Sequence, residues 1–238
     1  MLYYPSIWTA RVVMPLLARV RIAGRERVPR EGGFILVSNH ISHFDPHFLG
    51  MACPRRIDWM ASDVLFRHPL SRFYFRNVRT IFVRQYQGDH GALREAVRRA
   101  RQGRCIGIFA EGGIRAGEAS LVGGRPQLYY GAFMIAVLGR APIVPCLVLG
   151  TDRLYRPGNL LKRPPLWFRF GHPISVEGAT REDAPALREK FLAAFRALVE
   201  EVRTEGKIRD DDWPQTPQQR NPRIPLPKDS PATEKPGL

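Results

Sequence analysis

The stretch Phe34-Ile35-Leu36-Val37-Ser38-Asn39-His40-Ile41-Ser42-His43-Phe44-Asp45-Pro46 joins an apolar run to a polar turn. The apolar run predicts a buried strand, and the turn after it carries His40 and Asp45. A neutral imidazole accepts a proton near pH 7, and a carboxylate on its other nitrogen fixes the tautomer and stabilises the imidazolium. His40 and Asp45 are therefore a candidate general base and its orienting carboxylate. Because the chain has six histidines, such a pair also arises by chance, and the remaining sequence has to decide.

Length and composition predict one domain with a tail. The chain has 238 residues, of which 44% are hydrophobic, enough for a substantial core. Lys and Arg number 37 against 22 Asp and Glu, a formal net charge of +15. Such a surface attracts polyanions: nucleic acid, anionic lipid headgroups or phosphorylated substrates. The three cysteines form no metal-binding spacing, and two of them lie in apolar runs, which predicts buried thiols in a reducing compartment.

Residues 2–22 are predicted to form one or two helices with a kink near Pro15. Prolines and arginines interrupt this stretch, so no secretory signal is expected. Its longest apolar run, residues 12–18, is far shorter than the roughly 20 residues of a membrane span. The helix is amphipathic with Trp8 on its apolar side, and two placements stay open: the membrane interface or the domain's own core.

Alternating strand and helix patterns follow. Residues 80–83 and 105–109 read as strands, and the helix between them is capped by Asp89, with an arginine-rich face predicted to be solvated. A strand–helix–strand unit predicts parallel pairing. Residues 47–75 mix aromatic and basic side chains, which suits nucleic acid, a partly buried helix or a lipid-facing surface. Further patterns predict a helix over 129–138, strands over 142–149 and 166–170, and a helix opening at Thr180.

These patterns predict an α/β fold. We expect a single domain with a mostly parallel central sheet flanked by helices. The expected parts are an N-terminal amphipathic helical segment over residues 1–23, the domain itself over 24–208, and a Pro-rich disordered tail over 209–238.

Four segments place polar or distinctive residues at predicted strand ends, where open α/β sheets bind ligands. They are the His40/Asp45 turn, Arg84, the loop Glu111-Gly112-Gly113-Ile114-Arg115, and the strand Pro142-Ile143-Val144-Pro145. Backbone N–H groups of the Gly-rich turn could face an anion, with Arg115 reaching a phosphate.

In this order the segments resemble the glycerolipid acyltransferases, typified by bacterial 1-acylglycerol-3-phosphate acyltransferases. The Asn-His-x-Ser-x-x-Asp block corresponds to residues 39–45, and a short strand ending in Arg corresponds to residues 78–84. The Phe-Pro-Glu-Gly-Thr-Arg-Ser block corresponds to residues 109–115, with Ala110 and Gly113 replacing Pro and Thr and the Arg one position late. The Pro-Ile-Val-Pro block is residues 142–145. The resemblance spans roughly residues 3–205.

The resemblance implies roles for these residues. His40 would deprotonate the hydroxyl of a glycerolipid acceptor, which attacks an acyl thioester directly, and Asp45 would orient His40. The residues expected to bind the acceptor phosphate or shape its pocket are Arg84, Glu111, Gly112 and Arg115. The donor would be acyl-CoA or acyl carrier protein, with no resident cofactor or metal. The expected partners are a lysophospholipid acceptor and a membrane surface with anionic lipids, not nucleic acid, at the cytoplasmic face as a peripheral or monotopic protein. Because the third block is altered, the identity of the acceptor stays open, and it could be another lysolipid or a different alcohol.

Two other classes of function compete with this interpretation. A metal-dependent hydrolase could use His40, His43, Asp45 and His47, although their spacing differs from that of binuclear zinc hydrolases. A non-enzymatic module that binds anions or membranes would explain the charge, but it leaves the four ordered blocks unexplained.

Overall fold

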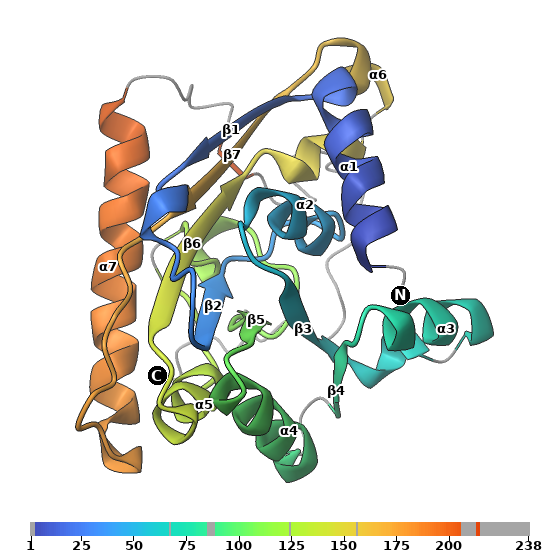
Figure 1. The fold of residues 1–238 in the computed structure, drawn as a ribbon. Helices are drawn as coiled ribbons and strands as arrows, with labels where there is room; N and C mark the ends of the chain where they lie inside the picture. Colours follow the sequence, from blue (N-terminus) through green and yellow to red (C-terminus); the bar gives the residue numbers. More distant parts are fainter. Residues whose placement is uncertain are drawn as a thin grey trace, which may run out of the picture.

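The computed structural model describes residues 3–66, 68–84, 89–123, 125–155, 157–205 and 213–214. A seven-stranded sheet runs through its centre in the order β1-β7-β6-β2-β5-β3-β4 (Figure 1). The strands are β1 (Arg19–Ala23), β2 (Phe34–Ser38), β3 (Ile57–Ser62), β4 (Ile81–Val83), β5 (Cys105–Phe109), β6 (Ile143–Leu149) and β7 (Pro165–Phe170). Neighbouring strands pair in parallel except β6 and β7, which are antiparallel. The mostly parallel α/β sheet predicted from the sequence is confirmed.

Helices cover both faces of the sheet (Figure 1). One face carries α1 (Tyr3–Leu17), α2 (Asp45–Ala52) and α3 (Pro69–Asn77), and the other carries α4 (His90–Arg101), α5 (Gly131–Gly139) and α7 (Ala184–Thr204). A short α6 (Pro157–Leu161) lies between β6 and β7. The central strand β2 is buried throughout, and its side chains alternate between the two cores. This double burial explains its unbroken apolar sequence.

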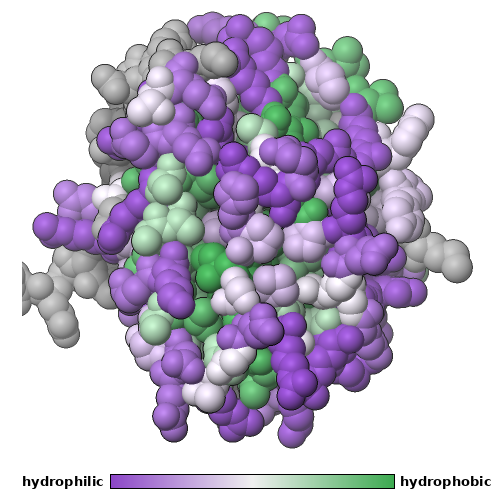
Figure 2. All heavy atoms as spheres, turned by 60° about the vertical axis from the view of Figure 1, so that its left-hand side comes forward, coloured by the Kyte–Doolittle hydropathy of each residue, from purple (hydrophilic) through white to green (hydrophobic). Residues whose placement is uncertain are grey.

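The helix boundaries follow the predicted capping signals. The Asp89 side chain accepts a hydrogen bond from Ala92 N at 3.0 Å, and Gly103, just after α4, has a positive φ of 78°. Thr180 forms a capping box with Asp183 before α7. The face seen in Figure 2, on the α7 side, is mostly hydrophilic, as the polar positions of α7 predict.

Two local predictions are wrong, and one strand, β3, was not predicted. Residues 19–23 form edge strand β1 and not a helix, because Val20 and Ile22 alternate with arginines at the period of a strand. Strand β3 lies within residues 47–75. Its first two residues, Ile57 and Asp58, are buried and the other four are half-buried, so its sequence does not alternate between apolar and polar positions. Strands β4 and β5 have the same direction but do not pair with each other, because β3 lies between them.

One arginine of the α4 face is largely buried, which differs from the solvated face predicted for it. Arg99 donates to the buried carboxylate of Asp58 at 3.1 Å, and Arg104 also pairs with that carboxylate. With Arg56, whose Nε lies 4.0 Å from the other oxygen, three guanidinium groups compensate the cost of burying Asp58 at the amino-terminal end of β3. The thiols of Cys105 and Cys146 are free and buried, as predicted, and so is that of Cys53.

Candidate active site

The predicted site lies where β2 and β5 end side by side. These strands are parallel with Ser38 opposite Phe109, so the turns after them emerge together. The backbone of Arg115 donates to His40 O at 2.8 Å, and the backbone of His40 donates to the Glu111 carboxylate at 2.6 Å. Two of the four predicted segments therefore form one structure.

His40 and Asp45 are in direct contact. The distance from His40 Nδ1 to Asp45 Oδ2 is 2.8 Å, and the same oxygen accepts the backbone N–H groups of Ile41 and Ser42 at 2.8 and 2.9 Å. Asp45 is fully buried in the first turn of α2, where the helix dipole favours a negative charge. The His40 side chain is 15% exposed, and among the described residues none hydrogen-bonds its Nε2. This geometry holds one ring nitrogen in place and leaves the other for a ligand.

Thr151, which is not among the predicted site residues, completes the set of hydrogen-bond donors around Asp45. Its hydroxyl donates to Asp45 Oδ1, the oxygen that His40 does not use. Thr151 begins η4 (Thr151–Tyr155), two residues after β6 ends, and is fully buried. Its position just beyond the carboxyl end of a strand is the same signal that identified His40, and it was available in the sequence.

Strand β6 contributes to the site through its carboxyl end and not through its Pro-Ile-Val-Pro block. Pro145 lies opposite Val37 within the sheet, so the predicted placement of residues 142–145 at a site-bearing strand end is wrong. Farther along, Asn39 donates to Val148 O and accepts from Val148 N, both at 2.8 Å. The Asn39 amide thus extends the ladder between β2 and β6 and fixes the start of the His40 turn.

Glu111 joins two loops and is itself 1% exposed. Its second carboxylate oxygen accepts Leu121 N at 2.7 Å, so both oxygens are occupied by backbone N–H groups. Burial raises the pKa of this carboxyl to about 7, although the two N–H donors oppose the shift. This arrangement suits holding the two loops together rather than contact with a ligand.

The pKa of Glu111 predicts a measurable pH dependence of stability. Between the usual value of 4.5 and about 7, the folded state keeps a proton that the unfolded state has lost. Stability therefore falls as pH rises through this window, by up to about 3 kcal/mol, and levels off above it. The measurement is the free energy of unfolding against pH for the wild type and Glu111→Gln. The variant should lose this part of the slope, and an unchanged slope would contradict the assignment.

The other predicted binding residues differ in position. Gly112 has a φ of 69°, and a Cβ there would lie 2.3 Å from the Tyr129 ring, so only glycine fits. Arg115 is partly buried and its backbone bonds to His40. Arg84 is exposed after β4, three strands from β2, or about 14 Å at the usual strand spacing. The described contacts bring Arg115 to the His40 turn and do not bring Arg84 there.

A column of aromatic rings supports His40. Its imidazole stacks on Phe109 with centroids 4.0 Å apart, and Trp59 stacks on the other face of Phe109 at 4.9 Å. Gly107 lies opposite Trp59, and a Cβ at Gly107 would lie 2.6 Å from the indole. The missing side chain lets the indole lie across β5 and reach Phe109. This column, Trp59–Phe109–His40, limits the orientations open to the imidazole.

The other two histidines near this turn, His43 and His47, form hydrogen bonds with tyrosine hydroxyls and not with Asp45. His43 bonds to the Tyr155 hydroxyl through its backbone N at 2.8 Å and its Nδ1 at 2.5 Å, and His47 Nε2 lies 3.1 Å from the Tyr74 hydroxyl. Within the described residues, no three His, Cys, Asp or Glu side chains gather closely enough to share a metal ion. The described geometry therefore offers no ligand set for a metal-dependent hydrolase.

Comparison with known proteins identifies the class. The family model described as acyltransferase matches residues 19–149, from β1 to the end of β6, so the chain belongs to the acyltransferase family and is an enzyme of that class. The match includes the His40 turn and the Glu111 loop.

Individual relatives agree with the family. The 1-acyl-sn-glycerol-3-phosphate acyltransferase of Bacillus subtilis is 24% identical over 81% of this chain and 91% of its own length. The protein of that name from Saccharomyces cerevisiae is 26% identical over 82% of this chain and 64% of its own length. The crystal structure of the 1-acyl-sn-glycerophosphate acyltransferase PlsC from Thermotoga maritima has the same fold, with a TM-score of 0.64 and 23% identity, covering 84% of this chain and 79% of that one.

Proposed function

We propose that this acyltransferase moves a fatty acyl chain from an acyl thioester to the free hydroxyl of 1-acyl-sn-glycerol-3-phosphate, giving phosphatidic acid. The observation that carries the proposal is the His40–Asp45 pair, with Nε2 left for a ligand at the carboxyl edge of the sheet. The names of the Bacillus and yeast relatives support the choice of acceptor.

His40 acts as the general base. Nε2 takes the proton of the acceptor hydroxyl as its oxygen attacks the thioester carbonyl, and Asp45 stabilises the imidazolium through Nδ1–H. The tetrahedral adduct then collapses, the C–S bond breaks, and the thiol leaves with the proton from His40. Attack is direct and no acyl-enzyme forms, in line with the lack of a Gly-x-Ser-x-Gly elbow in the sequence.

Arg115 holds the acceptor phosphate in this proposal. Its backbone bonds to His40 and its positive charge acts on the Glu111 carboxyl, while Arg84 follows the edge strand β4. A planar guanidinium suits bidentate binding of a phosphate. Glu111 and Gly112 shape this pocket by holding the loop that carries Arg115.

The donor is acyl-CoA or acyl carrier protein, both of which present the acyl chain as a thioester. Neither is a resident cofactor, because each is consumed as a substrate. The reaction itself needs only the thioester, the acceptor hydroxyl and the base.

The protein meets its lipid substrates at a membrane surface. One side of α1 is buried against the core through Tyr3 and Ile7, while Tyr4, Trp8 and Leu16 are 68 to 70% exposed. The two placements weighed for this helix are therefore compatible: it packs on the domain and also offers an apolar face. No helix among the described residues has the length and apolar character needed to span a bilayer. We propose peripheral or monotopic attachment to anionic lipids, with the reduced thiols favouring the cytoplasmic face.

The aromatic column predicts a kinetic effect. Trp59→Leu removes the stack under Phe109 and Gly107→Ala displaces the indole, so both should lower kcat by about 2- to 12-fold. Trp59→Phe, which keeps a ring at this position, is the matched control and should retain most activity. Steady-state kinetics should show the loss in kcat with KM nearly unchanged. A rise in KM alone would assign Trp59 to substrate binding instead.

The acceptor is tested by measuring thiol release from acyl-CoA and acyl carrier protein across a panel of acceptors. The panel contains 1-acylglycerol-3-phosphate, lysophospholipids with other headgroups and neutral monoacylglycerol. We expect the first to react fastest and Arg115→Ala to reduce its reaction more than that of the neutral acceptor. Equal losses would remove the phosphate role of Arg115, and preference for another acceptor would replace the proposed substrate.

A further inference from the structure

Helix α3 buries none of its own residues, although it carries large apolar side chains. Leu70 is 74% exposed and Phe73 is 63% exposed. The preceding turn η2 (Asp63–Phe66) adds two more exposed aliphatic side chains, those of Val64 and Leu65. Exposed apolar groups gathered on neighbouring turns mark an interaction surface more often than isolated ones do.

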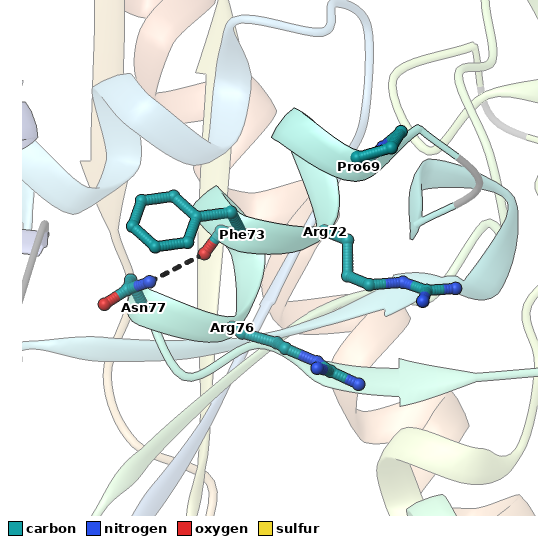
Figure 3. A pocket seen from close by; sticks show the side chains of 5 residues that line it. All are labelled: Pro69, Arg72, Phe73, Arg76 and Asn77. Carbon is teal, nitrogen blue, oxygen red and sulfur yellow. Dashed lines mark hydrogen bonds between the residues drawn. The ribbon is translucent and has the colours of Figure 1, made fainter.

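Two arginines lie together on the side of α3 away from Phe73. Figure 3 shows Phe73 and Asn77 on one side of the helix and Arg72 and Arg76 on the other. Together with Pro69, these residues line a shallow hollow of about 310 Å³. Helix α3 contains no acidic residue, and the nearest in the sequence is Asp63 at the start of η2. The charge of this surface calls for an anionic partner.

The position of α3 connects this surface to α1 and to the site. Arg56 stacks on the rings of Tyr3 and Tyr4 in α1 and donates to Val78 O, just after α3. The amino end of α1 thus lies beside α3 (Figure 1). At its other end α3 follows η2, which begins at the carboxyl end of β3, the same edge of the sheet as His40.

We propose that α3 and η2 form a second membrane contact, in which Leu70 and Phe73 enter the interface and Arg72 and Arg76 bind anionic lipid phosphates. The proposal goes beyond attachment through α1, and it rests on the lipid acceptor of the proposed function. Two contacts flanking one edge fix the tilt of the domain, so the edge with His40 faces the lipid surface.

A bilayer fits this surface better than a folded protein does. The apolar side chains project from the outside of a short helix, and the lining of the hollow comes from α3 alone. A lipid interface accepts exposed apolar side chains without shape complementarity, and arginine side chains can reach headgroups while apolar neighbours insert.

Vesicle sedimentation tests the proposal with the full chain. The vesicles contain phosphatidylcholine with or without phosphatidylglycerol. Leu70→Ser/Phe73→Ser should weaken binding to both kinds by about tenfold or more. Arg72→Gln/Arg76→Gln should weaken binding to the anionic vesicles by about 30-fold and leave binding to neutral vesicles unchanged. All four residues are exposed, so these variants should fold.

The matched control is Arg94→Gln/Arg181→Gln, which removes the same charge from exposed positions on the α4 side of the sheet. At 0.15 M salt it should bind nearly as well as the wild type, because distant charges are screened. If it weakens binding as much as the α3 pair does, the effect is one of net charge and the proposal is overturned. The proposal is also overturned if the α3 variants bind vesicles as well as the wild type does. In that case, loss of their binding to acyl carrier protein would assign the α3 surface to that protein instead.

Activity separates this proposal from the proposed function. With a short-chain, water-soluble acceptor, the α3 variants should turn over like the wild type, and they should slow only with acceptor in vesicles. If the wild type transfers no acyl group, the proposed function is wrong. The vesicle binding of the variants would still test whether α3 contacts the membrane. Equal slowing with both acceptors would assign α3 to the site and overturn the membrane contact.

Discussion

Replacement of His40 by alanine should abolish acyl transfer while leaving the fold intact. General-base catalysis contributes about 10²- to 10⁴-fold, and His40 is the base in the proposed reaction. Its side chain also stacks on Phe109, but it lies at the edge of the sheet and not in the core, so a small loss of stability is expected. The measurement is kcat for thiol release, with thermal unfolding alongside it.

His43→Ala is the matched control for this experiment. His43 lies three residues away and bonds to Tyr155, away from Asp45. It should keep kcat within a few-fold of the wild type. If both variants lost activity equally, the loss would reflect damage to the turn and not removal of the base.

Asp45→Asn should remove most activity without unfolding the protein. The carbonyl oxygen of asparagine can still accept the three donors now on Oδ2, and its NH₂ group can donate to the Thr151 hydroxyl. The negative charge that stabilises the imidazolium is lost. We expect kcat to fall about 10²- to 10⁴-fold with little change in the melting temperature. Activity near that of the wild type would show that the charge of Asp45 is not needed.

Thr151→Val serves as a milder perturbation of the same carboxylate. The charge and the His40 contact remain, but Asp45 Oδ1 loses its donor and stays buried. An unsatisfied buried acceptor costs about 1–3 kcal/mol of stability. Thr151→Ser keeps the hydroxyl and should restore most of that loss.

Local signals in the sequence were sufficient to predict the central strand and the pairing of His40 with Asp45 in the turn after it. Strand β2 is apolar because both of its faces are buried, and the turn after it must carry its polar side chains at the sheet edge. The pairing of His40 with Asp45 follows from four residues of turn and the first turn of α2. Residues this close in the sequence determine their own local geometry, so the geometry can be predicted from that segment alone.

Long-range geometry was harder to predict. The approach of Thr151 to Asp45 depends on β6 pairing next to β2, and the remoteness of Arg84 depends on β3 inserting between β5 and β4. Neither strand order nor β3 itself has a local signature strong enough to be recognised. The stack of Trp59 on Phe109 similarly needs Gly107 opposite the indole, a register that only the folded sheet defines.

We propose that His40 of this acyltransferase activates the hydroxyl of a phosphate-bearing lysolipid. Mass spectrometry of the lipid products tests it most directly, with labelled acyl thioester, 1-acyl-sn-glycerol-3-phosphate, and the wild type beside His40→Ala. The wild type should give phosphatidic acid that carries the labelled chain, and the variant should give none above background. Release of labelled free fatty acid alone, or equal phosphatidic acid from both proteins, would contradict it.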